Sequence, residues 1–125
     1  MENIFIEETK YTPEIRLDAQ KGEIYFKGKS YPENTFEFYT PILTWIEEYF
    51  TKDVQNKTVI NMEIIYFNSS SSKLFFDFFD IIDEASKNND IIINWIYDEE
   101  NDSALEAGED FIEDFNDLNF NLLKK

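Results

Sequence analysis

The stretch from Thr58 to Leu74, TVINMEIIYFNSSSSKL, decides the fold. Its first ten residues, ending at Phe67, are rich in β-branched and aromatic side chains, which is typical of a strand buried between two layers. We therefore place this strand at the centre of a sheet. After Asn68 and four serines, apolar side chains recur at the helical period up to Ala85, with acidic residues between them. The chain is thus predicted to pass from strand to helix through the sequence NSSSS.

On the N-terminal side of this stretch, polar and apolar residues alternate in Glu14–Asp18 and again in Glu23–Lys27. The turn residues between the two segments predict a β-hairpin. Asn34 is a suitable N-cap for a helix that extends to about Phe50. Pro41 falls inside this helical pattern, so we expect the regular helix to begin near Pro41.

On the C-terminal side, Asp90–Tyr97 predicts a second buried strand, and an acidic segment with helical periodicity follows it. A short strand is predicted at Asn119–Leu123. Since the helices separate parallel strands, the fold class is α/β, a sandwich with a mixed, mostly parallel sheet, an N-terminal hairpin and helices packed on it. Only 3 Gly and 3 Pro interrupt the 125 residues, and no linker divides them, so we expect one domain spanning 1–125.

The composition excludes several classes of function. With 27 acidic and 11 basic residues the net charge is -16, so nucleic acids and anionic membrane surfaces should repel the chain. The sequence contains no His and no Cys, which removes the usual acid/base group, the thiol nucleophile and the preferred zinc ligands. The N-terminus has no signal-peptide pattern, and no apolar run approaches the roughly 20 residues of a membrane span. A cytoplasmic location without membrane insertion is expected.

The segment Asn68-Ser69-Ser70-Ser71-Ser72 is the most informative feature, because α/β folds present functional groups where a strand ends and a helix begins. A helix cap alone would explain one or two of these polar side chains. Composition alone favours this structural reading, and the surplus of hydroxyls is the feature that points beyond it to regulation. A phosphate here would add about -1.5 to -2 charge, next to free N–H groups and the positive end of the helix dipole.

Two partial motifs carry less meaning. Ser70 and Lys73 satisfy the spacing S-x-x-K of penicillin-binding enzymes, but no K-T-G or S-D-N companion is present, so a chance match is preferred. Lys73 is read more simply as a surface charge or as a partner for a phosphate or carboxylate.

An EF-hand-like frame begins at Asp98, with further acidic residues at Glu100, Asp102 and Glu109. Ser103 stands where the EF-hand needs glycine, and helical signals run through the frame, so calcium binding is not predicted. Residues 98–117 contain ten acidic residues and no Lys or Arg. This charge could either steer a basic partner or keep the protein soluble, and the sequence leaves both readings open.

Four segments together give the chain a resemblance to a known family. They are TPEIRLD (12–18), GKSYPENTFEFYTPILTWIEEY (28–49), IIYFNSSSSK (64–73) and WIYDEENDSALEAGEDF (95–111). In this order and over nearly the full length, the chain resembles the SiaC family of bacterial regulatory phosphoproteins. That family is related in fold to the STAS-type anti-sigma factor antagonists, so the resemblance implies a STAS-like sandwich.

The resemblance implies phosphorylation of the first hydroxyl residue after the asparagine, which here is Ser69. The family commonly has threonine at this position, and the serines that follow make Ser70 the second choice. A dedicated Ser/Thr protein kinase and a metal-dependent Ser/Thr phosphatase would act on the site. The unphosphorylated form would bind and activate a diguanylate cyclase, raising cyclic di-GMP and favouring biofilm or aggregation, and phosphorylation would abolish that binding.

The sequence therefore predicts a non-enzymatic signalling protein without cofactor, metal site or catalytic residues. The expected partner-binding residues are Asn68, Ser69, Ser70, Ser71, Ser72 and Lys73. Two other classes stay open. One is an anti-sigma factor antagonist in a partner-switching pathway, and the other is an enzyme that uses clustered carboxylates, for which no defined constellation is visible.

Overall fold

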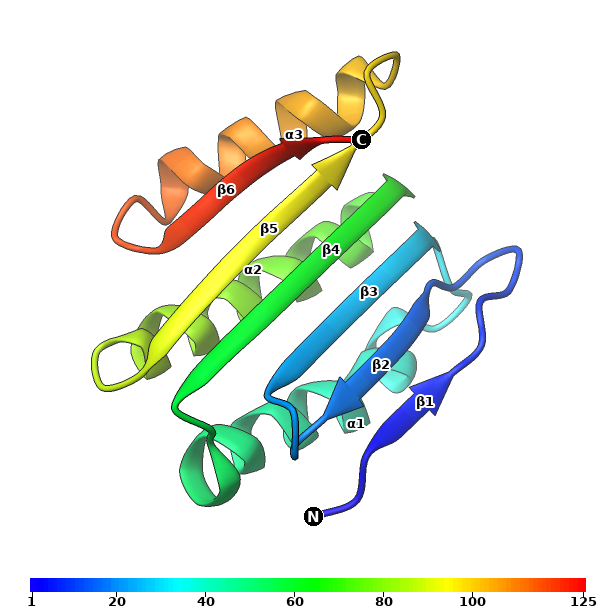
Figure 1. Cartoon of the computed structure of the whole chain (residues 1–125). Helices are drawn as coiled ribbons and strands as arrows, with labels where there is room; N and C mark the ends of the chain where they lie inside the picture. Colours follow the sequence, from blue (N-terminus) through cyan, green and yellow to red (C-terminus); the bar gives the residue numbers. More distant parts are fainter.

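The fold is a single six-stranded sheet with helices packed on it (Figure 1), seen in a computed structural model that describes residues 1–125. The strands are β1 (Ile4–Ile6), β2 (Glu14–Asp18), β3 (Glu23–Ser30), β4 (Lys57–Phe67), β5 (Asp90–Tyr97) and β6 (Asn119–Lys124). The helices are α1 (Thr35–Glu48), the short π-helix η1 (Tyr49–Asp53), α2 (Ser69–Ser86) and α3 (Asp102–Asp114). The strands lie in the order β1-β2-β3-β4-β5-β6, so every strand pairs with its neighbour in sequence.

The sheet is mixed, and most of its pairs are parallel, as predicted. β1, β2 and β3 pair antiparallel, whereas β3, β4, β5 and β6 pair parallel through the crossover helices. The predicted hairpin is confirmed as β2 and β3, and the predicted central strand is β4, which pairs with both β3 and β5. β1 was not predicted, because three residues are too few to show a strand periodicity.

The predicted N-cap Asn34 is confirmed, but the expectation that the regular helix begins near Pro41 is wrong. α1 begins at Thr35, six residues before Pro41, which lies inside the helix. Asn34 fixes this start, because its side-chain oxygen accepts from the Glu37 amide at 3.0 Å and its side-chain amide donates to the Glu37 carboxylate at 3.2 Å. Because Pro41 has no backbone N–H, α1 lacks one internal hydrogen bond at this position.

The central strand is covered by helices on one face only, which corrects the expectation that it is buried between two layers. Buried and half-buried residues alternate along β3, β4 and β5, so one side of each strand faces the core. All three crossovers step in the same direction along the sheet, and right-handed crossovers then place their helices on the same side. Figure 1 shows α1 and α2 passing behind the strands.

The opposite face of the sheet has no helix on it and carries a row of paired side chains, of which Phe5 is 60% exposed. Phe5, Arg16 and Tyr25 occupy adjacent strands, and the Arg16 guanidinium lies 5.2 Å from the Phe5 ring centroid and 5.4 Å from that of Tyr25. In the next two strands Asn61 and Asn94 stand opposite each other, and Asn94 donates to the Asn61 side-chain oxygen at 2.9 Å. On this face, cation–π contacts and an amide hydrogen bond link neighbouring strands.

Candidate functional site

The NSSSS segment lies at the edge of the sheet where the parallel strands end. β4 ends at Phe67, Asn68 is the N-cap of α2, and the helix begins at Ser69. The Asn68 amide donates to the Ser30 carbonyl at 3.1 Å, which ties the loop to the end of β3. Since two neighbouring strands hold its entry, the loop has a rigid base.

The cap leaves part of the helix N-terminus available. The Asn68 side-chain oxygen accepts from the Ser71 amide at 2.8 Å, and the Ser72 amide donates to the Asn68 carbonyl at 3.0 Å. The amides of Ser69 and Ser70 have no acceptor within the protein. An anion at this position would therefore meet two free N–H groups and the positive end of the helix dipole.

The four serines divide into exposed and inward-facing residues. Ser69 and Ser70 are exposed, Ser72 is half-buried, and Ser71 is fully buried at 0% exposure. Ser71 had been expected among the residues that contact a partner. Its burial instead makes it an internal anchor, and leaves Ser69 and Ser70 as the hydroxyls that a modifying enzyme could reach.

A chain of buried hydroxyl groups lies beneath the loop. The Ser71 hydroxyl donates to the Ser30 carbonyl at 2.9 Å and lies 2.7 Å from the Ser30 hydroxyl, which in turn lies 2.5 Å from that of Tyr39. These contacts join α2, β3 and α1. Ser30 and Tyr39 were not predicted as part of the site. Ser30 and Ser71 are 41 residues apart in sequence, and nothing local to either residue shows that their hydroxyls meet. Tyr39 lies on the apolar stripe of its helix, which gives no signal that its hydroxyl contacts Ser30.

Burial raises the pKa of the Tyr39 hydroxyl well above its ordinary value, and the hydrogen bond with Ser30 opposes this shift only partly. Above about pH 10 the unfolded chain loses this proton while the folded chain keeps it, so we expect stability to fall as pH rises, by up to about 1.4 kcal/mol per pH unit for one group. Tyr39→Phe should remove this part of the slope in urea unfolding between pH 9 and 11. Tyr66→Phe, which alters a tyrosine that is 54% exposed, should retain it. A slope that is the same in Tyr39→Phe and the wild type would contradict the assignment.

Lys73 lies four residues after Ser69 in α2, one helical turn away, and both side chains are exposed. It is the only cation in α2, so it is the nearest charge of that helix able to meet a phosphate on Ser69. Ser70 and Lys73, the pair with S-x-x-K spacing, make no hydrogen bond with each other.

A β-bulge shapes the strand just before the loop. Gly28 pairs with Ile64 and Lys29 pairs with Tyr66, so Ile65 is an extra residue in β4. The Ile65 carbonyl accepts instead from the Asn101 side chain at 3.0 Å. The bulge turns Ile65 and Tyr66 outward, with 44% and 54% of their side chains exposed beside the loop.

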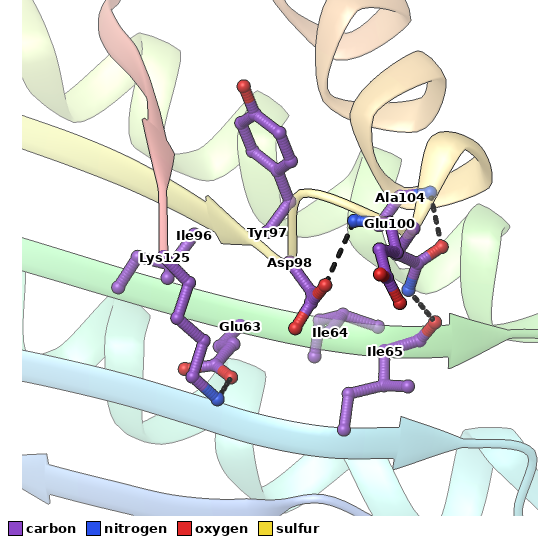
Figure 2. A pocket seen from close by; sticks show the side chains of 10 residues that line it. Glu63, Ile64, Ile65, Ile96, Tyr97, Asp98, Glu100, Ala104 and Lys125 are labelled. Carbon is purple, nitrogen blue, oxygen red and sulfur yellow. Dashed lines mark hydrogen bonds and ion pairs between the residues drawn. The ribbon is translucent and has the colours of Figure 1, made fainter.

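A cavity of about 440 Å³ lies on the other side of this bulge, between the ends of β4 and β5 and the start of α3 (Figure 2). Several of its polar groups are paired with one another. Lys125 donates to the Glu63 carboxylate at 2.9 Å, and the Glu100 amide donates to the Asp98 carboxylate at 2.9 Å. The hydrogen bond with Glu63 raises the pKa of the Lys125 ammonium. The cavity therefore offers no convergent acid and base.

The acidic residues of the EF-hand-like frame are distributed along α3. Asp98 lies in the loop before it, Asp102 is its first residue, and Glu109 lies in its second half. No three Asp or Glu side chains are grouped so that they could hold a metal ion. No helix in the structure is long and apolar enough to cross a bilayer.

Fold and site together define a class of protein: a small mixed α/β domain that presents exposed hydroxyls at the N-terminus of a rigidly held helix, a position that favours a negatively charged group. The sequence assigns the chain to one family of this class. The chain belongs to the SiaC family regulatory phosphoproteins, whose model matches residues 6–125.

Relatives in Pseudomonas aeruginosa agree with this assignment. A protein of strain UCBPP-PA14 is 34% identical over 115 residues, which cover 91% of this chain and 90% of that protein. The structure of SiaC of Pseudomonas aeruginosa matches with a TM-score of 0.85 and 30% identity, over 100% of this chain and 98% of that one. A crystal structure of the diguanylate cyclase SiaD in complex with its activator SiaC matches with a TM-score of 0.85 and 31% identity, over 97% of both chains.

Proposed function

We propose that this chain is a non-enzymatic regulator whose partner binding is controlled by reversible phosphorylation of Ser69. In its unphosphorylated form it binds and activates a diguanylate cyclase, which raises cyclic di-GMP and favours biofilm or aggregation. The observation that carries this proposal is the exposed Ser69 hydroxyl on the first residue of α2, beside two free backbone amides.

The position of Ser69 supports a switch that works without refolding. Ser71 and the Asn68 cap hold the first turn from below, while Ser69 extends into solvent. A phosphate there would be stabilised by the helix N-terminus and by Lys73, so the fold would tolerate it. A partner that covers the same surface would instead have to desolvate a doubly charged group, and binding would be lost.

The rest of the proposed system follows from this site. A Ser/Thr protein kinase would add the phosphate, and a metal-dependent Ser/Thr phosphatase would remove it. The relative SiaC is the activator of a diguanylate cyclase, which supports that enzyme class as the partner here. Such a partner needs GTP, so we place this chain in the cytoplasm. The partner-contact residues are then Asn68, Ser69, Ser70, Ser72 and Lys73.

The test combines mapping of the modification with a cyclase assay. The protein is purified from its native host, and the phosphorylated residue is mapped by peptide mass spectrometry. Each diguanylate cyclase of that host is then expressed and assayed with the phosphorylated and the unphosphorylated chain. We expect phosphate on Ser69, activation of one cyclase by the unphosphorylated form, and none by the phosphorylated form. Absence of phosphate on the loop, together with no cyclase activated by either form, would refute the proposal.

A further inference from the structure

A groove between α2 and α3 begins beside the serine loop. It has a volume of about 440 Å³, and Phe67, Phe76, Ala107 and Phe111 supply its apolar surface. Phe67 and Ala107 also line a smaller hollow of about 190 Å³ that continues toward Ile65 and Tyr66. We call the two together the α2–α3 groove.

The apolar surface of this groove is open to solvent. Phe76 is 37% exposed, although its ring contacts Phe111 and Phe115 with centroids 5.3 and 5.8 Å apart. At the other end, Ile65 and Tyr66 are 44% and 54% exposed. Large apolar side chains that line a hollow and stay exposed are typical of a protein-binding surface.

Ser69 stands at the end of this groove. Ser69, Ser72 and Phe76 are spaced i, i+3 and i+7 in α2, and such residues share one face of a helix. Ser72 and Phe76 both line the groove, so the exposed Ser69 continues the same face toward the helix N-terminus. A segment bound in the groove would therefore approach the Ser69 hydroxyl.

The wall of the groove formed by α3 is acidic. Asp110, Glu113 and Asp114 line it, and none of them makes an ion pair within the chain. The three α-helices as a whole carry a strong excess of negative charge. α1 has three carboxylates, α2 has four and α3 has six, and Lys73 is the single cation among them. The strands, in contrast, carry five acidic and five basic residues. An occupant complementary to the groove would be apolar in its centre and basic along one side.

We propose that the α2–α3 groove is where the partner protein docks, through a segment that places an apolar anchor on Phe76 and directs lysines or arginines at Asp110, Glu113 and Asp114. This inference rests on the proposed function, and it adds the surface and the chemistry of the partner. A phosphate on Ser69 stops docking through its volume and its desolvation cost at the end of the groove. The acidic wall meanwhile accelerates association at low salt.

Two groove variants test this, each with a matched control in the separate hollow between α1 and α2, which Glu47, Asp80 and Ala85 line. Ala107→Leu fills the groove, and Ala85→Leu makes the same change in the control hollow. Glu113→Lys with Asp114→Lys reverses two charges in the groove, and Glu47→Lys with Asp80→Lys reverses two charges in the control. Because both double variants change the net charge equally, only the location differs.

The probe is the host cyclase that the unphosphorylated wild-type chain activates, and its affinity is measured at 50 and 300 mM salt. Variants are first compared in urea unfolding, so that loss of the fold is not mistaken for loss of binding. We expect both groove variants to bind about tenfold more weakly or worse, and both controls within about twofold of wild type. The charge reversal in the groove should also reduce the salt dependence.

The outcomes separate this inference from the proposed function. If a phosphate on Ser69 abolishes cyclase binding but groove and control variants bind alike, the docking site lies elsewhere and the proposed function stands. If the unphosphorylated wild-type chain binds and activates no host cyclase, the proposed function fails, and the inference drawn from it fails as well.

Discussion

Ser69→Asp is expected to weaken binding of the cyclase by roughly 30- to 1,000-fold, which corresponds to about 2 to 4 kcal/mol. The reason is that an uncompensated carboxylate would have to be desolvated at the surface that the partner covers. Ser69 is the first residue of α2, where an acidic side chain is favourable, so the free energy of unfolding should stay the same or rise slightly. The loss of affinity would therefore not reflect a loss of fold. Isothermal titration calorimetry with the purified cyclase measures it.

The controls for this prediction come from the same loop. Ser69→Ala removes the hydroxyl without adding charge and should retain binding within a few-fold. Ser70→Asp adds the same charge one residue further along the helix, about 100° around its axis, and should cost less. Equal affinities of Ser69→Ala and Ser69→Asp would show that charge at this position does not control the partner. A larger loss in Ser70→Asp than in Ser69→Asp would transfer the switch to Ser70.

The position of the switch loop could be predicted because it depends on local patterns. The run from Thr58 to Phe67 has the composition of a strand, the residues after Ser72 have the helical period, and Asn68 is a good N-cap. Each of these signals lies within a few residues of the loop. The fold class followed from the same kind of information, since helices between strands require parallel pairing.

The division of the four serines could not be predicted, because it depends on tertiary contacts. Ser71 is buried since its hydroxyl meets Ser30, which comes from a strand 41 residues earlier in the chain. In sequence the four serines are identical, and only packing distinguishes an anchor from a reachable hydroxyl. The groove was hidden for the same reason: its apolar surface combines Phe67 of β4, Phe76 of α2 and Phe111 of α3.

The bare face of the sheet shows a second limit of periodicity. In β4, Val59, Asn61 and Glu63 alternate with buried residues, but β-branched and aromatic neighbours make the strand look buried on both faces. The helices lie on one side because every crossover moves the chain to the next strand in the same direction along the sheet. That direction is set by the strand order. Strand order in turn depends on pairings that a single sequence does not display.

Phe79→Ala is expected to destabilise the protein by roughly 3 to 5 kcal/mol, a large share of the roughly 5 to 15 kcal/mol that keeps a domain of this size folded. Phe79 is fully buried in α2, and its ring contacts Phe111, Phe115 and Phe120 with centroids 4.9, 5.6 and 5.2 Å apart. It therefore joins α2 to the C-terminal end of α3 and to β6. Truncation would leave a cavity that three separate elements would have to close.

The measurement is urea unfolding followed by tryptophan fluorescence, with Phe36→Ala as the matched control. Phe36 is 73% exposed at the start of α1, so the same truncation there should change the free energy of unfolding by no more than about 0.5 kcal/mol. Phe79→Leu, which refills most of the cavity, should cost roughly 1.5 kcal/mol. Phe79 is buried on the core side of α2, whereas Ser69 of the same helix is exposed to solvent. Under conditions in which the Phe79→Leu variant is folded, its affinity for the cyclase should therefore equal that of the wild type. A cost for Phe79→Ala no larger than that for Phe36→Ala would mean that this ring cluster does not hold the three elements together.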